Sequence, residues 1–232
     1  PTRLIAQLRR PDRVYTTSEL YLLDAPVACP ADDGRPLVLL TGFLPFPAGS
    51  DNANSSREAA LGFDPASVPE ARVLAVELPV EFDTAAAMVA DLSERCAPAV
   101  VVGFGQGRWR VDLETTAYNG KDTSEVAGGA PDNRGLVLDG DAIREGGPDE
   151  LPTRLPIDAI HGQLTLAGVD VARSDDPGRY ICNNLFYSLA VDAPPERIVG
   201  FVHLPILRSV GDADRAMLQT VVETVVRESL AA

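Results

Sequence analysis

The sequence of 232 residues predicts one α/β domain, in which helices cover both faces of a mostly parallel, twisted sheet to form a three-layer sandwich. Three observations support this fold class. Short apolar runs recur along the chain, and segments with a helical apolar period lie between them. The runs are continuously apolar rather than alternating, as expected of strands buried on both faces. The chain is also long enough to bury a large core.

The first half of the chain is predicted to contain three strands and two helices. Residues 36–42 (PLVLLTG) form a continuous apolar run that ends in glycine, and a serine at the start of 55–61 can cap a helix there. Residues 72–78 (RVLAVEL) predict a second strand, and apolar residues recur at helical spacing over 82–96. Residues 98–104 (PAVVVGF) predict a third strand with glycines at its carboxyl end.

The second half continues the alternation. A helix is predicted over 158–167 and a strand over 168–172. Residues 182–191 are apolar enough for a buried helix, and residues 197–203 (RIVGFVH) predict another buried strand. The amphipathic period over 212–230 predicts a long closing helix. Because reactive groups gather at the carboxyl ends of parallel strands, the loops after these strands are the first place to look for a site.

Two regions fall outside this alternation. Residues 1–35 are predicted to be an N-terminal extension and linker with a short helix and a helical patch near 17–23, so the main domain spans 36–232. Residues 119–153 are rich in Gly, Asp and Pro and poor in bulky apolar residues, which predicts a long surface excursion.

Charge and composition exclude several classes of function. The 20 Lys and Arg residues against 34 Asp and Glu give a net charge of −14, which opposes binding to nucleic acid or to an anionic membrane. No apolar run approaches the roughly 20 residues of a spanning helix. The N-terminus turns charged at Arg9 and Arg10, so we expect no signal peptide and a cytoplasmic location.

The cysteine and histidine content argues against a metal centre. The chain has three cysteines without CxxC spacing and only two histidines, so we predict no metal site and no disulfide framework. Cys29 and Cys96 are interpreted as small buried apolar residues. His161 lies in a helical pattern without an evident partner. The run Gly103-Phe-Gly-Gln-Gly107 follows a strand but lacks the spacing of a dinucleotide-binding loop, so we interpret it as a backbone turn.

Three residues could form a nucleophilic triad. Cys182 is placed at the first turn of a buried helix, where the helix dipole and unpaired amide groups favour a thiolate and could hold an oxyanion. His203 follows 21 residues later at the end of a buried strand and could act as its base. Glu114 is the candidate that orients the imidazole. A buried cysteine and a hydrogen-bonded strand-end histidine are the commoner explanation of such residues.

Seven segments, in order, resemble motifs of the pyroglutamyl peptidase I family (pyrrolidone-carboxylate peptidases, which are cysteine peptidases). They are VLLTGFLPF at 38–46, ELPVEF at 77–82, the stretch from Val102 to Asn119, PDNRG at 131–135, LPI at 155–157, GRYICN at 178–183 and FVHLP at 201–205. The resemblance implies a phosphorylase/hydrolase-like sandwich, a catalytic triad of Glu114, Cys182 and His203, no cofactor, and a homo-oligomer. It implies that the substrate is a small peptide with a blocked N-terminus.

The resemblance also implies which side chains bind the substrate. Phe43 and Phe46 would flank a small lactam ring, and Ile181 would line the pocket. Asn54 matches the asparagine of the family's Asn-Pro turn, and Phe104 stands where the family commonly has glutamine, with Gln106 nearby.

Other departures leave the substrate open. Residues 128–130, which include Gly129, replace the arginine that precedes the PDN motif, and Asn184 replaces a histidine. We therefore consider a diverged amidase, cyclase or acyl-transferase that keeps the triad but acts on another small acyl group. A non-catalytic binding protein, with residues 1–35 as its partner surface, is the third hypothesis.

Overall fold

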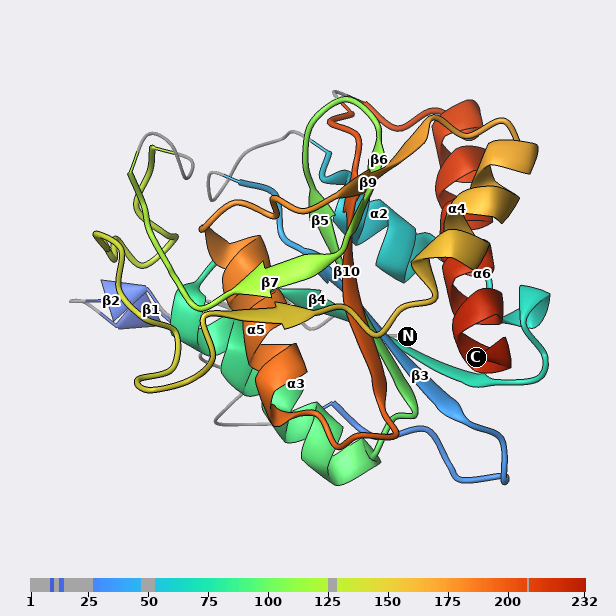
Figure 1. The fold of residues 1–232 in the computed structure, drawn as a ribbon, viewed down its shortest axis with the longest axis horizontal. Coiled ribbons are helices and arrows are strands. Elements are labelled where there is room, and N and C mark those ends of the chain that lie inside the picture. Colours follow the sequence, from blue (N-terminus) through green and yellow to red (C-terminus); the bar gives the residue numbers. More distant parts are fainter. Residues whose placement is uncertain (1–8, 11–12, 15–26, 47–52, 125–128, 208) are drawn as a thin grey trace.

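The computed structural model describes residues 9–10, 13–14, 27–46, 53–124, 129–207 and 209–232. At its centre is a six-stranded sheet (Figure 1). In spatial order its strands are β4 (Arg72–Leu78), β3 (Leu37–Phe43), β5 (Val100–Gln106), β10 (Ile198–Leu204), β6 (Val111–Glu114) and β9 (Val171–Ser174). The first four strands are parallel, so their carboxyl ends share one edge.

The last two strands run against the others. β6 pairs antiparallel with β10 and parallel with β9. The connection from β5 to β6 is residues 107–110, which is too short for the crossover helix that a parallel return needs. The strand at β6 was absent from the elements that the sequence predicts, because four residues are too few to show a clear pattern.

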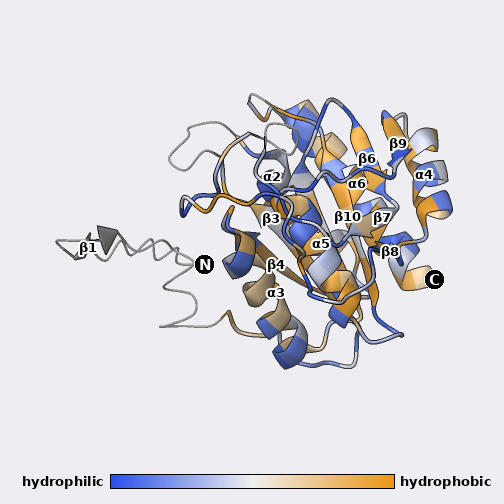
Figure 2. Cartoon of the chain, turned by 60° about the vertical axis from the view of Figure 1, so that its left-hand side comes forward, coloured by the Kyte–Doolittle hydropathy of each residue, from blue (hydrophilic) through white to orange (hydrophobic). Residues whose placement is uncertain are grey.

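Helices cover both faces of the sheet, which confirms the predicted three-layer fold class. They are α2 (Ser55–Gly62), α3 (Phe82–Cys96), α4 (Ile157–Leu166), α5 (Ile181–Asp192) and α6 (Asp212–Ala231), with a short 3-10 turn at Pro65–Ser67. Helices α2, α4 and α6 pack together on one face, and α3 and α5 pack on the other. Apolar residues gather between the layers (Figure 2).

The described part of the long segment after Glu114 pairs with itself and packs on the domain, which the prediction of a surface excursion did not include. β7 (Thr116–Tyr118) pairs antiparallel with β8 (Glu150–Pro152), which lies near the end of the segment. Leu136, Leu138 and Ile143 pack against the apolar cluster around α3 and α5. The prediction for residues 119–153 was therefore incomplete, because two leucines and an isoleucine anchor part of a segment that its composition describes as a loop.

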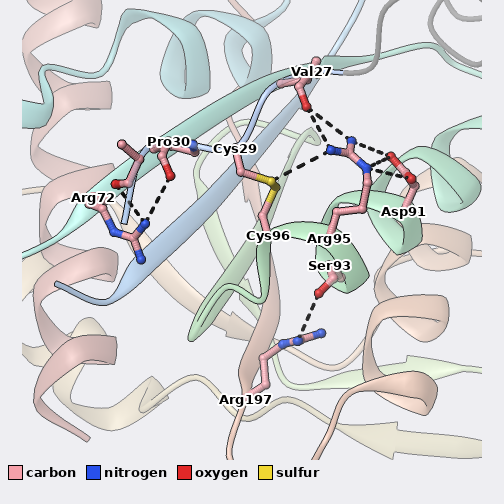
Figure 3. Close-up of a disulfide and its surroundings, with 10 residues drawn as sticks. Val27, Cys29, Pro30, Arg72, Asp91, Ser93, Arg95, Cys96 and Arg197 are labelled. Carbon is pink, nitrogen blue, oxygen red and sulfur yellow. Dashed lines mark hydrogen bonds and ion pairs between the residues drawn. A yellow bond between two sulfur atoms is a disulfide. The ribbon is translucent and has the colours of Figure 1, made fainter. Parts of the chain in front are cut away.

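The N-terminal segment is tied to the domain by a disulfide, which corrects the interpretation of Cys29 and Cys96 as separate buried residues. Their sulfurs are bonded, and their Cα atoms are 5.4 Å apart (Figure 3). Cys96 is the last residue of α3, and the chain from residue 27 onward lies along that end of the helix. Cys29 and Cys96 are 67 positions apart, so the sequence around either cysteine does not indicate that the two pair.

Two arginines hold the same segment by its backbone. Arg95 donates to the carbonyl oxygen of Val27 at 3.2 Å and pairs with Asp91 one turn earlier. Arg72 on the edge strand β4 donates to the carbonyl oxygen of Pro30 at 3.2 Å (Figure 3). In the described part of residues 1–35 there is no helix, and β1 (Arg9–Arg10) and β2 (Arg13–Val14) pair antiparallel. The helical patch predicted near 17–23 lies outside the described residues.

Candidate active site

Cys182, His203 and Glu114 come together near the carboxyl ends of β5 and β10. Cys182 lies in the first turn of α5, His203 near the end of β10, and Glu114 at the end of β6. The Nδ1 atom of His203 lies 2.7 Å from Oε1 of Glu114. Since Nδ1 is engaged by the carboxylate, Nε2 is the ring nitrogen left to interact with the thiol. The glutamate side chain is only 1% exposed.

A salt bridge from Arg110 distinguishes a neighbouring carboxylate, Asp112, from Glu114. β10 and β6 pair so that His203 lies opposite Asp112 and Phe201 lies opposite Glu114. Alternate residues share a face, so both carboxylates lie on the side of the imidazole. Asp112, however, accepts a hydrogen bond from Arg110 at 2.8 Å. Its carboxylate is thus neutralised, and Glu114 is left to bind His203.

Glycines on β5 make room for the reactive side chains. A Cβ atom built on Gly105 would lie 2.8 Å from Sγ of Cys182, and one on Gly107 would lie 2.7 Å from Cβ of His203. A Cβ atom on Gly103 would lie 2.5 Å from the ring of Phe201. Gly103 and Gly105 lie on one face of β5, and Gly107 directly follows the strand. The repeat that resembles a nucleotide loop therefore supports Phe201, Cys182 and His203, and it is the signal that sequence reasoning missed.

The imidazole is held in its protonated form. Burial disfavours the charge, but the charge of Cys182 and hydrogen bonds to Cys182 and Glu114 outweigh burial and raise the pKa of His203 to about 10. Oε2 of Glu114 is buried and finds no hydrogen-bond donor among the described residues. The imidazolium is therefore the main partner that compensates the buried carboxylate.

Two asparagines fix the start of α5. Asn183 accepts from the backbone N–H of Tyr118 at 2.9 Å and donates to its carbonyl oxygen at 2.8 Å, which ties the helix to β7. Asn184 donates to the carbonyl oxygen of Phe82 at 2.8 Å, which ties it to α3. The side chain of Tyr180, at the N-cap of α5, makes no capping hydrogen bond, and no other side chain of the described residues caps this turn. Its leading amide groups are therefore left for another acceptor.

Aromatic side chains form a wall beside the cysteine. The ring centroid of Tyr180 lies 5.9 Å from that of Phe46 and 5.4 Å from that of Phe82. The hydroxyl of Tyr180 donates to the carbonyl oxygen of Pro131 at 3.2 Å. Phe43 is buried in the same apolar cluster, to which Ile181 also belongs with 1% of its surface exposed. Phe43, Phe46 and Ile181 thus lie on the side of the sheet where Cys182 lies.

Phe104 lies away from the cysteine, which corrects its expected place at the substrate. Its side chain is fully buried in the cluster under α2, α4 and α6. Residues alternate between the faces of a strand, so Phe104 points opposite to Gly103 and Gly105. Gln106 accepts from the backbone N–H of Ser55 at 3.1 Å and so anchors α2.

Asn54 is occupied by local structure. Its side-chain oxygen accepts from the backbone N–H of Ser56 at 3.0 Å, so Asn54, and not a serine, caps α2. Its side-chain nitrogen donates to the carbonyl oxygen of Leu44 at 3.1 Å. Both polar groups are therefore used to hold the loop that presents Phe46. This arrangement indicates a positioning role in place of direct contact with a substrate.

The described residues show neither a metal centre nor a membrane span. No three of their His, Cys, Asp or Glu side chains gather where they could hold a metal ion. Among the helices of the described part, none is long and apolar enough to cross a bilayer. Gly129 lies in the loop before Pro131, and Gly128 is outside the described residues.

Comparison with known sequences gives a consistent result. A family model described as pyroglutamyl peptidase matches residues 37–232. The pyrrolidone-carboxylate peptidase of Cupriavidus necator is 35% identical over 176 residues, which are 73% of this chain and 78% of that protein. The pyrrolidone-carboxylate peptidase of Thermococcus onnurineus is 33% identical over 196 residues, which are 82% of this chain and 93% of that protein.

Solved structures resemble the chain over the same region. The crystal structure of pyroglutamyl peptidase I from Bacillus amyloliquefaciens has a TM-score of 0.75 and 27% identity, and the match covers 85% of this chain and 98% of that one. For the pyrrolidone carboxyl peptidase of Thermus thermophilus the TM-score is 0.72 and the identity 30%, with 82% of this chain and 99% of that one covered.

Proposed function

Since the chain belongs to the pyroglutamyl peptidase family, we propose that it removes an N-terminal pyroglutamyl residue from peptides as a cysteine-type hydrolase. The observation that carries this proposal is the charged pair of His203 and Glu114, 2.7 Å apart, beside the free thiol of Cys182 at the start of α5. The alternative, an enzyme that acts on another small acyl group, has less support than the sequence suggested, because Phe104 faces away from the thiol.

The first half of the proposed reaction forms an acyl-enzyme. The Cys182 thiolate attacks the carbonyl carbon that joins the pyroglutamyl group to the next residue, and a C–S bond forms. The imidazolium of His203 then gives its proton to the leaving nitrogen, the C–N bond breaks, and the shortened peptide departs with a free amino group. Glu114 keeps the imidazole oriented and stabilises its positive charge throughout.

The second half returns the enzyme to its starting state. His203, now neutral, takes a proton from water, and the hydroxide attacks the thioester carbonyl. The C–S bond breaks, pyroglutamate departs, and the thiolate and imidazolium are restored. The negative oxygen formed in each half would be held by the uncapped amide groups at Ile181 and Cys182, because the helix start points its N–H groups toward that position.

The lactam ring would lie against the aromatic wall. Phe46 and Tyr180 offer flat apolar surface beside the thiol, and Phe43 and Ile181 close the floor. A small neutral ring fits such a surface, whereas the charged α-amino group of an unblocked peptide would be desolvated there without a partner. This contrast supports selectivity for the blocked N-terminus.

Turnover of a pyroglutamyl peptide by the pure protein tests this proposal. Wild type is expected to release pyroglutamate, and both iodoacetamide and the substitution Cys182→Ala should abolish release. Cys29→Ser is the matched control, because Cys29 lies in a disulfide away from the site and should leave the chemistry intact. Robust turnover by the Cys182→Ala protein would overturn the mechanism.

The compartment is a separate part of the proposal. We propose a cytoplasmic location, and the Cys29–Cys96 disulfide opposes it, because such bonds form and persist mainly in oxidising compartments. Alkylation of the native protein in freshly lysed cells, followed by mass spectrometry, decides the question. Free thiols at both positions support the cytoplasm, and an intact disulfide contradicts it.

A further inference from the structure

The only tryptophan of the chain is exposed beside the catalytic edge. Trp109 lies in the connection 107–110 between β5 and β6 and is 83% exposed. Ile206, just after β10, is 42% exposed. Large apolar side chains are costly to leave in water, so two of them at the rim of a site call for an explanation.

The connection 107–110 passes over the carboxyl end of β10. β6 lies on the far side of β10 from β5, so the chain has to cross that strand to reach it. The N–H of Gly107 donates to Leu204 at 2.8 Å, and the N–H of Ile206 donates to Arg108 at 3.0 Å. These bonds set Ile206 next to the connection. Gly107 contacts His203, and Trp109 is two residues further, a span of at most about 7 Å.

The order of the strands indicates how a peptide substrate would be oriented in the site. The aromatic residues Phe43 and Phe46 belong to the end of β3, the thiol of Cys182 lies over Gly105 on β5, and His203 is on β10. In the proposed reaction His203 has to reach the leaving nitrogen. The pyroglutamyl ring therefore lies toward β3, and the leaving peptide extends toward the carboxyl end of β10. The connection that carries Trp109 crosses this end, and Ile206 follows it.

We propose that Trp109 and Ile206 form a ledge that binds the first side chain of the leaving peptide and favours an apolar or aromatic residue there. This inference rests on the proposed function. An aromatic side chain on the ledge covers the exposed indole, which adds favourable contact only for substrates that carry such a residue.

A selectivity ratio tests the ledge. Wild type should hydrolyse pyroglutamyl-phenylalanine with a higher kcat/KM than pyroglutamyl-glycine, and Trp109→Ala should lower this ratio by about 2- to 10-fold, the range that one aromatic contact supplies. The loss should appear mainly as a higher KM for the phenylalanine peptide. Leu166→Ala is the matched control, because Leu166 is also 83% exposed but lies at the end of α4. An unchanged ratio in Trp109→Ala overturns the inference.

Fluorescence gives a second readout that does not depend on turnover. In the Cys182→Ala protein, pyroglutamyl-phenylalanine should shift the tryptophan emission to shorter wavelength, because Trp109 is the sole tryptophan and loses contact with water. Pyroglutamate alone should leave the emission unchanged. A shift with pyroglutamate, or none with a dipeptide at saturating concentration, overturns the ledge.

The two proposals fail in different ways. If wild type hydrolyses neither dipeptide, the proposed function is wrong and the ledge falls with it. If wild type hydrolyses both dipeptides and the ratio is the same in wild type and Trp109→Ala, the proposed function stands and only the ledge is wrong.

Discussion

His203 keeps its proton at neutral pH because the charge of Cys182 and the hydrogen bonds that the imidazolium donates to Cys182 and Glu114 outweigh its burial. In the proposed reaction that proton goes to the leaving nitrogen. Activity should thus persist while the imidazolium is intact and fall as the pH rises through its raised pKa of about 10. The alkaline limb of the rate profile therefore reports the loss of this proton from His203.

Glu114→Gln should move this alkaline limb to lower pH. The substitution removes a negative charge and weakens a hydrogen bond that raises the pKa of His203, so the imidazolium loses its proton earlier, by about one pH unit or more. The profile of kcat/KM against pH measures the change. Asp112→Asn is the control on the same strand, because Asp112 pairs with Arg110. A limb that stays in place in Glu114→Gln, or moves equally in both variants, contradicts this account.

Gly105→Ala should remove activity and also lower the free energy of unfolding. The added methyl would lie 2.8 Å from the sulfur of Cys182 and 2.8 Å from the buried ring of Phe201, so both side chains have to shift and the nucleophile leaves its place beside His203. We expect kcat to fall by at least about 100-fold, since a displacement near 1 Å disrupts the reacting geometry.

Gly162→Ala provides the comparison for this substitution. Gly162 lies in α4 with open space around its Cα, so alanine there should preserve activity and stabilise the helix by about 0.5–1 kcal/mol. Urea unfolding and turnover are measured for both variants. Full activity in Gly105→Ala would show that the cysteine tolerates the contact.

At the scale of single residues, the sequence pointed to side chains that have distinctive chemistry. Cys182, His203 and Glu114 are rare or charged types at strand and helix ends, and the fold brings them together. Sequence reasoning misplaced Phe104, because a phenylalanine next to a glycine repeat shows its face only when the strand register is known. It missed Gly105 and Gly107 as supports, because a glycine's neighbours across strands are invisible in the sequence.

The disulfide acts at the scale of elements, since it joins the end of α3 to the segment that precedes β3. Cys29→Ser and Cys96→Ser should each lower the free energy of unfolding by about 2–4 kcal/mol, because the bond restricts the unfolded chain. Urea denaturation of the oxidised protein measures this loss. Cys182→Ser is the control and should unfold near the wild-type midpoint. Equal midpoints for all four proteins would show that the bond adds no stability.

Most elements could be predicted because each has a local signal. The helix over 82–96 has a clear apolar period, and its bounds are reproduced by α3. β6 and the pair of β7 and β8 had no such signal, since each strand is very short and is stabilised by partners distant in sequence. The disulfide was missed for the same reason, because its sulfurs come from segments 67 positions apart.

The whole molecule carries a net charge of −14, and this charge should affect which peptides it meets. A short pyroglutamyl peptide has no charged amino group, so a free carboxyl terminus makes it an anion. Raising the salt from about 10 to 150 mM should increase kcat/KM for such an acid roughly 2- to 5-fold, because screening weakens the repulsion. The C-terminal amide of the same peptide should respond little. An equal salt effect on both forms would show that net charge does not govern encounter.

The layered architecture could be predicted at this scale because alternation of strand and helix leaves few alternatives. The direction of β6 and β9 could not, since it depends on the connection 107–110 and on where β10 later inserts between β5 and β6. The position of β10 also determines the geometry of the site. It puts His203 next to Gly105 of β5 on one side and next to β6, which carries Glu114, on the other.

The bond between Cys29 and Cys96 divides the chain into a covalent ring and an open remainder. The ring holds β3, α2, β4 and α3, and with them Phe43 and Phe46, whereas Glu114, Cys182 and His203 all follow it. The closed part thus supplies Phe43 and Phe46 of the proposed lactam-binding surface, and the linear part supplies Tyr180, Ile181 and the groups that break the bond. A protease that cuts once inside the ring would leave both fragments joined, so the nick would appear on a gel only after the thiols are reduced.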